Sequence, residues 1–100
     1  MIVVRNVFRL RFGSAREARE LWKEGAPLVA RAMRGPVRVM SDLVGPYYTL
    51  VMESSHASLA DYESAAGSGM ADPEWKAWYA RFVPLVESGY REVFSLVETA

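Results

Sequence analysis

The sequence predicts an α+β domain in which a four-stranded antiparallel sheet carries helices on one face, and three observations lead to this prediction. Side chains alternate with a period of two over residues 2–12, which is typical of a half-buried strand. Apolar side chains recur at helical spacing over residues 14–35. Two strand-like runs, residues 37–44 and 47–54, are joined by Gly45-Pro46, a short link suited to an antiparallel hairpin.

Capping residues mark where the helices begin. Ser14 and Glu17 form a capping box, in which the Ser14 hydroxyl accepts a hydrogen bond from the Glu17 amide. Ser58 is expected to cap a short second helix. Asp72 followed by Pro73 predicts the start of a third helix, because aspartate caps well and proline is tolerated at the first helical position.

Glycine and proline mark the expected interruptions. Pro27 predicts a kink inside the first helix, because it lacks a backbone donor. The Gly67-Ser68-Gly69 segment is expected to break the second helix and act as a hinge, and Ser88-Gly89 to end the third, before a last strand over residues 90–98. The third helix is predicted from a stripe of Trp75, Trp78, Tyr79, Phe82, Leu85 and Val86.

The resulting β-α-β-β-α-α-β order predicts a ferredoxin-like sandwich, whose sheet has one face without helices. That face should carry Val3, Val7 and one of two sets from the hairpin: Val37, Val39 and Leu43, or Tyr47, Thr49 and Val51. A partly apolar surface of that size is a liability on a monomer. We therefore expect a homodimer that forms through the open sheet face.

The composition excludes several classes of site and partner. The 100 residues form one domain, residues 1–100, with an ordinary 51% hydrophobic and 24% charged content. The absence of cysteine excludes disulfides, cysteine-ligated metals and a thiol nucleophile, and a single histidine argues against a histidine-rich metal site. Twelve basic and twelve acidic residues cancel, so neither nucleic acid nor a membrane is an expected partner. Without a signal core or spanning segment, a cytoplasmic location is predicted.

The zero net charge conceals a division along the chain. The first fifty residues hold nine basic and four acidic groups, whereas the last fifty hold three and eight. Folding should bring opposite charges together across the sheet, with Arg5, Arg9 or Arg11 near Glu53, Glu92 or Glu98. In the alternative interpretation, arginines of the strands, among them Arg9 and Arg38, bind an anionic substrate inside the barrel.

Three stretches carry a family resemblance: Phe12-Gly13-Ser14, Asp-Pro-Glu-Trp-Lys-Ala-Trp-Tyr over residues 72–79, and Phe-Val-Pro-Leu-Val over residues 82–86. With the element order, they resemble the dimeric α+β barrel superfamily, and within it NIPSNAP-like small proteins. The resemblance implies two ferredoxin-like subunits packed sheet to sheet. It also implies a range of activities, since the superfamily includes cofactor-free monooxygenases, haem-degrading enzymes, isomerases and proteins of no known activity.

The haem-degrading members carry an asparagine early in the first strand, with a tryptophan and a histidine on later helices. This chain has Asn6 and either Trp75 or Trp78, but His56 precedes the helix that should supply the haem ligand. We therefore expect no haem and no other cofactor.

Seven residues are candidates for the site, and each has an ordinary structural interpretation beside the functional one. His56, in a loop after the third strand, and Asn6 are the catalytic candidates; the alternatives are a solvated loop histidine and a buried amide that satisfies backbone groups. Arg9, Tyr47, Trp75, Trp78 and Tyr79 are the candidates for binding a substrate. At their helical spacing, Trp75, Trp78 and Tyr79 are more often part of a core.

Two hypotheses for the function follow. In the first, a homodimeric α+β barrel binds a small apolar or aromatic molecule between sheet and helices, with cofactor-free oxygenation or isomerisation as the chemistry and His56 or a tyrosine as the acid–base group. This hypothesis predicts an enclosed cavity of about 300 Å³ or more near His56 or Asn6. In the second, the protein is a non-catalytic structural or protein-interaction subunit, because no residues stand at catalytic spacing.

Overall fold

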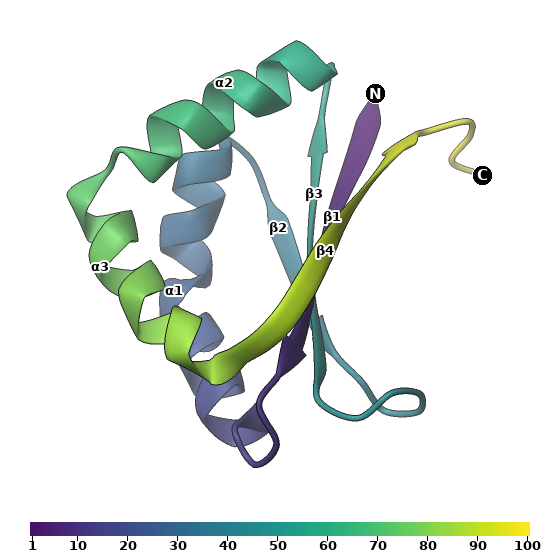
Figure 1. Ribbon diagram of the computed structural model, residues 1–100. Coiled ribbons are helices and arrows are strands. Elements are labelled where there is room, and N and C mark those ends of the chain that lie inside the picture. The colour runs from purple at the N-terminus through teal and green to yellow at the C-terminus, as the bar shows by residue number, and fades with distance from the viewer.

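The sheet and its three helices form two layers in the computed structural model, which describes residues 1–100 (Figure 1). The elements follow the order β1 (Ile2–Leu10), α1 (Ala15–Met33), β2 (Val37–Ser41), β3 (Thr49–His56), α2 (Leu59–Met70), α3 (Pro73–Phe82), a 3-10 turn η1 (Val83–Leu85) and β4 (Val86–Ser95). The strand order is β2-β3-β1-β4, with every neighbouring pair antiparallel. The predicted β-α-β-β-α-α-β architecture is confirmed.

The register of the sheet decides which side chains meet the helices. Val4 and Leu50 are almost completely buried on the helix side. On the other side, Val7 stands opposite Val51 on β3 and Tyr90 on β4. Of the two hairpin sets considered from the sequence, the open face therefore carries Thr49 and Val51, whereas Val37 and Val39 pack against the core.

Aromatic rings dominate the core between the layers. Phe82 is fully buried and makes edge-to-face contacts with Phe8 at 5.0 Å and Trp22 at 5.4 Å between ring centroids. The indole of Trp78 lies against Gly25 and donates a hydrogen bond to the Leu21 carbonyl at 3.0 Å. A Cβ atom at residue 25 would lie 2.1 Å from the indole, so glycine is required where α3 crosses α1.

The predicted caps are confirmed at two of three helices. The Ser58 hydroxyl accepts from the Asp61 amide at 3.1 Å, and the Asp72 carboxylate accepts from the Glu74 amide at 2.9 Å. The Ser14 prediction was wrong, because the Ser14 side chain makes no capping hydrogen bond. Ser14 has φ −98° and ψ 7°, away from the extended conformation that turns a capping side chain toward the helix amides.

The predicted break at Gly67-Ser68-Gly69 was also wrong, because α2 continues through these residues to Met70. A Cβ atom at Gly69 would lie 2.7 Å from Cβ of Ala32. The glycine thus serves the close packing of α2 on α1 rather than a hinge. Helix α1 likewise runs past Pro27 to Met33 without ending.

Strand boundaries differ from the prediction at both loops of the sheet. The first strand ends at Leu10 instead of residue 12, and the hairpin strands are separated by residues 42–48 rather than by two residues. A longer loop forms because the Asp42 carboxylate accepts from the Thr49 amide at 2.9 Å, and because Gly45 and Tyr48 both adopt positive φ.

The last strand begins at Val86, four residues before the predicted start. Leu85 and Val86, taken from their spacing as helical, lie in η1 and β4. Pro84 explains the early end of the helix, because it has no N–H to continue the helical hydrogen bonding.

Candidate functional site

A cavity of about 310 Å³ lies between the sheet and the helices, and we call it the aromatic cavity. Its volume falls within the range of small-molecule sites. All three tryptophans of the chain line it. Its wall is completed mainly by rings and methionines, namely Phe8, Tyr62, Tyr79, Met33, Met52 and Met70. A cavity of the expected volume is therefore present beside Asn6, but it is open to solvent on one side and not enclosed as predicted.

On the side of the cavity formed by β4, space is available because residue 89 is a glycine without a side chain. Gly89 stands directly opposite Phe8, so a side chain at residue 89 would project to the helix side of the sheet. A Cβ atom there would also lie 2.9 Å from the Val7 carbonyl oxygen. The absent side chain therefore leaves room beside Phe8 without disturbing the pairing of β1 with β4.

The polar groups of the cavity gather where β1 and β4 pair. Asn6 and Arg91 are opposite each other, and Arg91 Nε donates to Asn6 Oδ1 at 3.2 Å. The guanidinium carbon of Arg91 lies 5.8 Å from the centroid of the Tyr62 ring, a cation–π contact. On another part of the wall, Trp22 Nε1 is buried and has no acceptor. No aspartate or glutamate lines the cavity.

The structure brings four of the seven predicted site residues together in this cavity. Asn6, Trp75, Trp78 and Tyr79 line it, with Trp75 and Tyr79 stacked at 4.6 Å between ring centroids. The aromatic residues belong at the same time to the core or pack against it. The functional and structural interpretations of this stripe are thus compatible, because the core wall is also the cavity wall.

His56 does not lie in a loop, as the sequence predicted, and does not line the cavity. It is the last residue of β3, is 8% exposed, and its Nε2 lies 2.9 Å from the Ser54 hydroxyl. Burial lowers the pKa of the His56 imidazole, opposed by the weaker attraction of Asp61. Its ring contacts the ring of Tyr62 at 5.1 Å, so it reaches the cavity only through that tyrosine.

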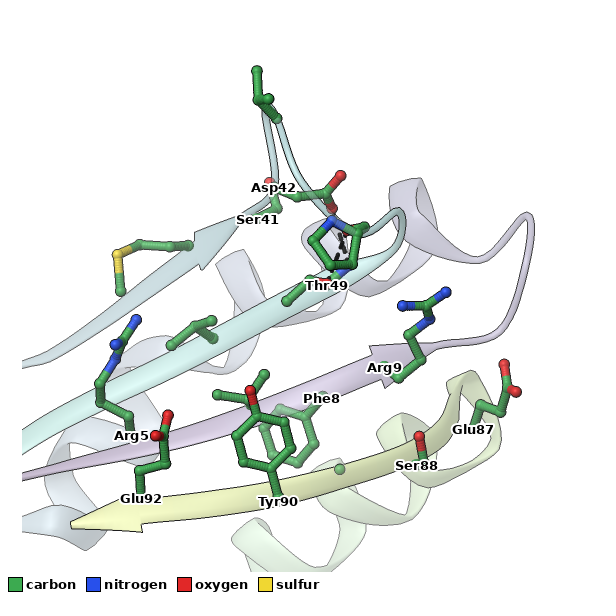
Figure 2. Close-up of a pocket in the computed structure, with 16 residues that line it drawn as sticks. Arg5, Phe8, Arg9, Ser41, Asp42, Thr49, Glu87, Ser88, Tyr90 and Glu92 are labelled. Carbon is green, nitrogen blue, oxygen red and sulfur yellow. Dashed lines mark hydrogen bonds between the residues drawn. The ribbon is translucent and has the colours of Figure 1, made fainter.

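The face of the sheet without helices, which we call the open face, holds a wide hollow of about 750 Å³ (Figure 2). Val7, Met40, Val51 and Tyr90 form an apolar band across its middle. Arg9 projects from β1 on this side, away from the aromatic cavity. Tyr47 lines neither space and is 75% exposed.

The charges of the open face confirm the cross-strand pairing for one of the three arginines. Arg5 Nε lies 3.4 Å from Glu53 Oε2, and Arg38 donates to the other Glu53 oxygen at 2.7 Å. Arg9 has no carboxylate within 4.0 Å, and Arg11 instead donates to the Pro84 carbonyl at 3.0 Å. Glu92 stands opposite Arg5 across β1 and β4 without a direct ion pair.

Arg91 is the charged cavity residue that sequence reasoning did not place in the site. The available signal was the alternation of the last strand. Gly89 and Arg91 share the helix side of β4, as Asn6 does on β1, so both strands carry a polar residue within an otherwise apolar layer.

No group of three or more aspartate, glutamate, histidine or cysteine side chains is arranged to hold a metal ion. None of the helices combines the length and apolar sequence needed to cross a membrane.

Solved structures with this fold come from several bacteria. A NIPSNAP family protein from Agrobacterium tumefaciens superposes with a TM-score of 0.91 at 25% identity, over 97% of this chain and 93% of that one. A NIPSNAP domain protein from Burkholderia xenovorans superposes with a TM-score of 0.87 at 17% identity, over 100% of this chain and 98% of that one. SnoaB, a cofactor-independent oxygenase from Streptomyces nogalater, superposes with a TM-score of 0.71 at 14% identity, over 98% of this chain and 94% of that one.

These likenesses establish the fold seen in dimeric α+β barrel structures. No curated protein matches the sequence. The NIPSNAP family profile matches residues 5–100, which is nearly the whole chain. The chain therefore belongs to the NIPSNAP family.

Proposed function

We propose that this protein binds a small aromatic or apolar molecule in the aromatic cavity. The observation that carries the proposal is the cavity itself, about 310 Å³ between sheet and helices, with every tryptophan of the chain in its wall. Rings contribute large contact areas, so a flat apolar ligand gains most of its binding free energy there. Asn6 and Arg91 supply the few polar groups that orient a ligand in such a site.

A fluorescence titration with the neutral dye N-phenyl-1-naphthylamine tests this proposal. We expect saturable binding of one dye per chain. Ala66 lines the cavity from α2, so Ala66→Phe should fill it and weaken binding about tenfold or more. Ala60→Phe, on an exposed position of the same helix, is the matched control and should bind the dye normally. Equal binding by the two variants would contradict the proposal.

We further propose that the working unit is a homodimer formed through the open face. The support is the apolar band of Val7, Met40, Val51 and Tyr90, on a sheet face that no helix covers. Packing two such faces together removes this band from water and gives each copy the same contacts.

For the chemistry, we propose cofactor-free oxygenation or isomerisation of the bound molecule. Both reactions include a proton transfer to or from the substrate. Tyr62 and Tyr79 are two of the three tyrosines that line the cavity, and their hydroxyl groups suit an acid–base role. The shared fold with a cofactor-independent oxygenase supports this class. Oxygen uptake with aromatic compounds that displace the dye would test oxygenation, and Tyr62→Phe and Tyr79→Phe should reduce the rate without abolishing dye binding.

A second candidate function is a non-catalytic interaction subunit. Three apolar side chains at one end of the sheet favour it, because Leu43, Val44 and Phe12 are 99%, 98% and 86% exposed. Exposed apolar groups gathered at one site are typical of protein contacts. Dye binding without any turnover of the compounds that bind would favour this candidate.

A further inference from the structure

We propose that the ligand of the aromatic cavity is an aromatic oxyanion, whose carboxylate or phenolate oxygen binds Arg91 and Asn6 while its rings lie among the tryptophans. This inference rests on the proposed function, since it names the class of molecule that the cavity takes. Two observations support it. Hydrogen-bond donors at the polar end of the cavity have no acceptor in the protein, and no acidic side chain neutralises the charge there.

The polar end of the cavity presents more free hydrogen-bond donors than free side-chain acceptors. Asn6 Oδ1, the acceptor of that amide, accepts a hydrogen bond from Arg91 Nε at 3.2 Å. The Asn6 amide nitrogen and the two terminal nitrogens of Arg91 have no protein acceptor. The hydrogen bond from Arg91 therefore fixes the amide so that its NH₂ group is offered to a ligand.

The charge of Arg91 has no partner in the protein. No carboxylate lies within 4.0 Å of it, and no acidic residue lines the cavity. The next acidic residue on the strand, Glu92, projects to the opposite face, where it stands across from Arg5. The contact of the guanidinium with the Tyr62 ring holds Arg91 beside the cavity. A planar guanidinium in this position binds an oxyanion through two parallel hydrogen bonds.

The remainder of the wall selects an aromatic body for that anion. The stacked pair of Trp75 and Tyr79 borders the cavity, and Trp22 and Trp78 meet edge to face at 4.7 Å between ring centroids. Trp22 also lines the cavity, so its indole adds to the aromatic contact area offered to the ligand.

Arg9, the arginine of the open-face hollow that has no carboxylate partner, offers a weaker site. Arg9 lies on the open face, and its hollow also contains the carboxylates of Asp42, Glu87 and Glu92 (Figure 2). These carboxylates repel an anion, and that surface lacks the tryptophans that would hold a ring. Charge and shape together thus favour Arg91 over Arg9.

Displacement of N-phenyl-1-naphthylamine by a matched pair of competitors tests the inference. At neutral pH and low salt, 2-naphthoate should displace the dye at about one-tenth the concentration that its neutral amide, 2-naphthamide, requires. Arg91→Gln should reduce this preference to less than about twofold while the dye still binds. Asn6→Asp, which adds a carboxylate beside Arg91, should also remove the preference. Arg9→Gln is the control and should retain it.

The outcomes separate this inference from the proposed function. If the dye does not bind to the natural protein, the aromatic cavity is not a binding site and the proposed function fails. If the dye binds but both competitors displace it equally, the oxyanion inference is overturned and the proposed function stands. Loss of the preference in Arg9→Gln but not in Arg91→Gln would place the anion on the open face and would also overturn the inference.

Discussion

Arginines of the two faces of the sheet are in opposite situations, except for Arg9 of the open face, which has no carboxylate within 4.0 Å. On the open face, Arg5 and Arg38 share the carboxylate of Glu53 at 3.4 and 2.7 Å. On the helix side, Arg91 is bonded to the neutral amide of Asn6 and has no carboxylate partner. The same residue type thus supports the sheet on one face and leaves its charge available on the other. An arginine alone does not indicate a binding site. Whether it does depends on its neighbours.

The largest expected effect concerns the packing of the helix side. Phe82 is fully buried between Phe8 and Trp22, so Phe82→Ala should remove its contacts and lower the free energy of unfolding by about 3–5 kcal/mol. Urea unfolding followed by circular dichroism measures this change. A loss below about 1 kcal/mol would show that the aromatic cluster is not the core described here.

The next effect concerns the open face and the proposed homodimer. Val51 lies in the middle of the apolar band, and Val51→Asp would place an unpaired charge there, at a cost of about 3 kcal/mol or more if a second copy covers it. Light scattering at micromolar concentration should give about 22 kDa for the natural protein, twice its 11.2 kDa chain mass, and the monomer mass for the variant. A monomeric natural protein would refute the homodimer.

A smaller effect is expected from the ion pairs of the open face. Glu53→Gln removes the shared partner of Arg5 and Arg38, whose side chains are 39% and 72% exposed. Because solvent screens such pairs, the free energy of unfolding should fall by about 1 kcal/mol or less. A loss of several kcal/mol would mean that this face is more deeply buried than in the single chain.

The smallest effect is a dependence of stability on pH. Burial lowers the pKa of His56 in the folded protein, so the unfolded chain binds more protons between that pKa and about 6.5. The contribution of His56 to the free energy of unfolding is therefore fully present above about pH 6.5. It is lost as the pH falls through this window. His56→Gln should flatten this part of the pH profile of the melting temperature. If the slope is unchanged, another group causes the pH dependence.

The fold followed from the sequence because the strongest signals were local. The alternation of β1 and the caps at Ser58 and Asp72 are properties of a few neighbouring residues, and the structure confirms them. Gly69 misled because glycine within a helix either breaks the helix or permits close packing, and only the position of Ala32 decides which.

The site was predicted less completely because it depends on the pairing of strands. The last strand divides into two mixed sets, one with Gly89 and Arg91 and the other with Tyr90 and Glu92. Neither set is clearly apolar, so the alternation alone does not show which one meets the helices. Asn6 was identified because one set of alternating side chains on β1 is clearly apolar. Arg91 could be recognised as a site residue only from the strand register, which places it opposite Asn6.

We propose that the helix side of the sheet, and not the open face, holds the ligand. A two-dimensional ¹H–¹⁵N NMR titration with 2-naphthoate tests it directly, because all three indole N–H groups belong to residues that line the aromatic cavity. We predict that the indole signals of Trp22, Trp75 and Trp78 shift together and saturate. Shifts confined to the amides of Met40, Val51 and their neighbours, with the indole signals unchanged, would contradict the claim.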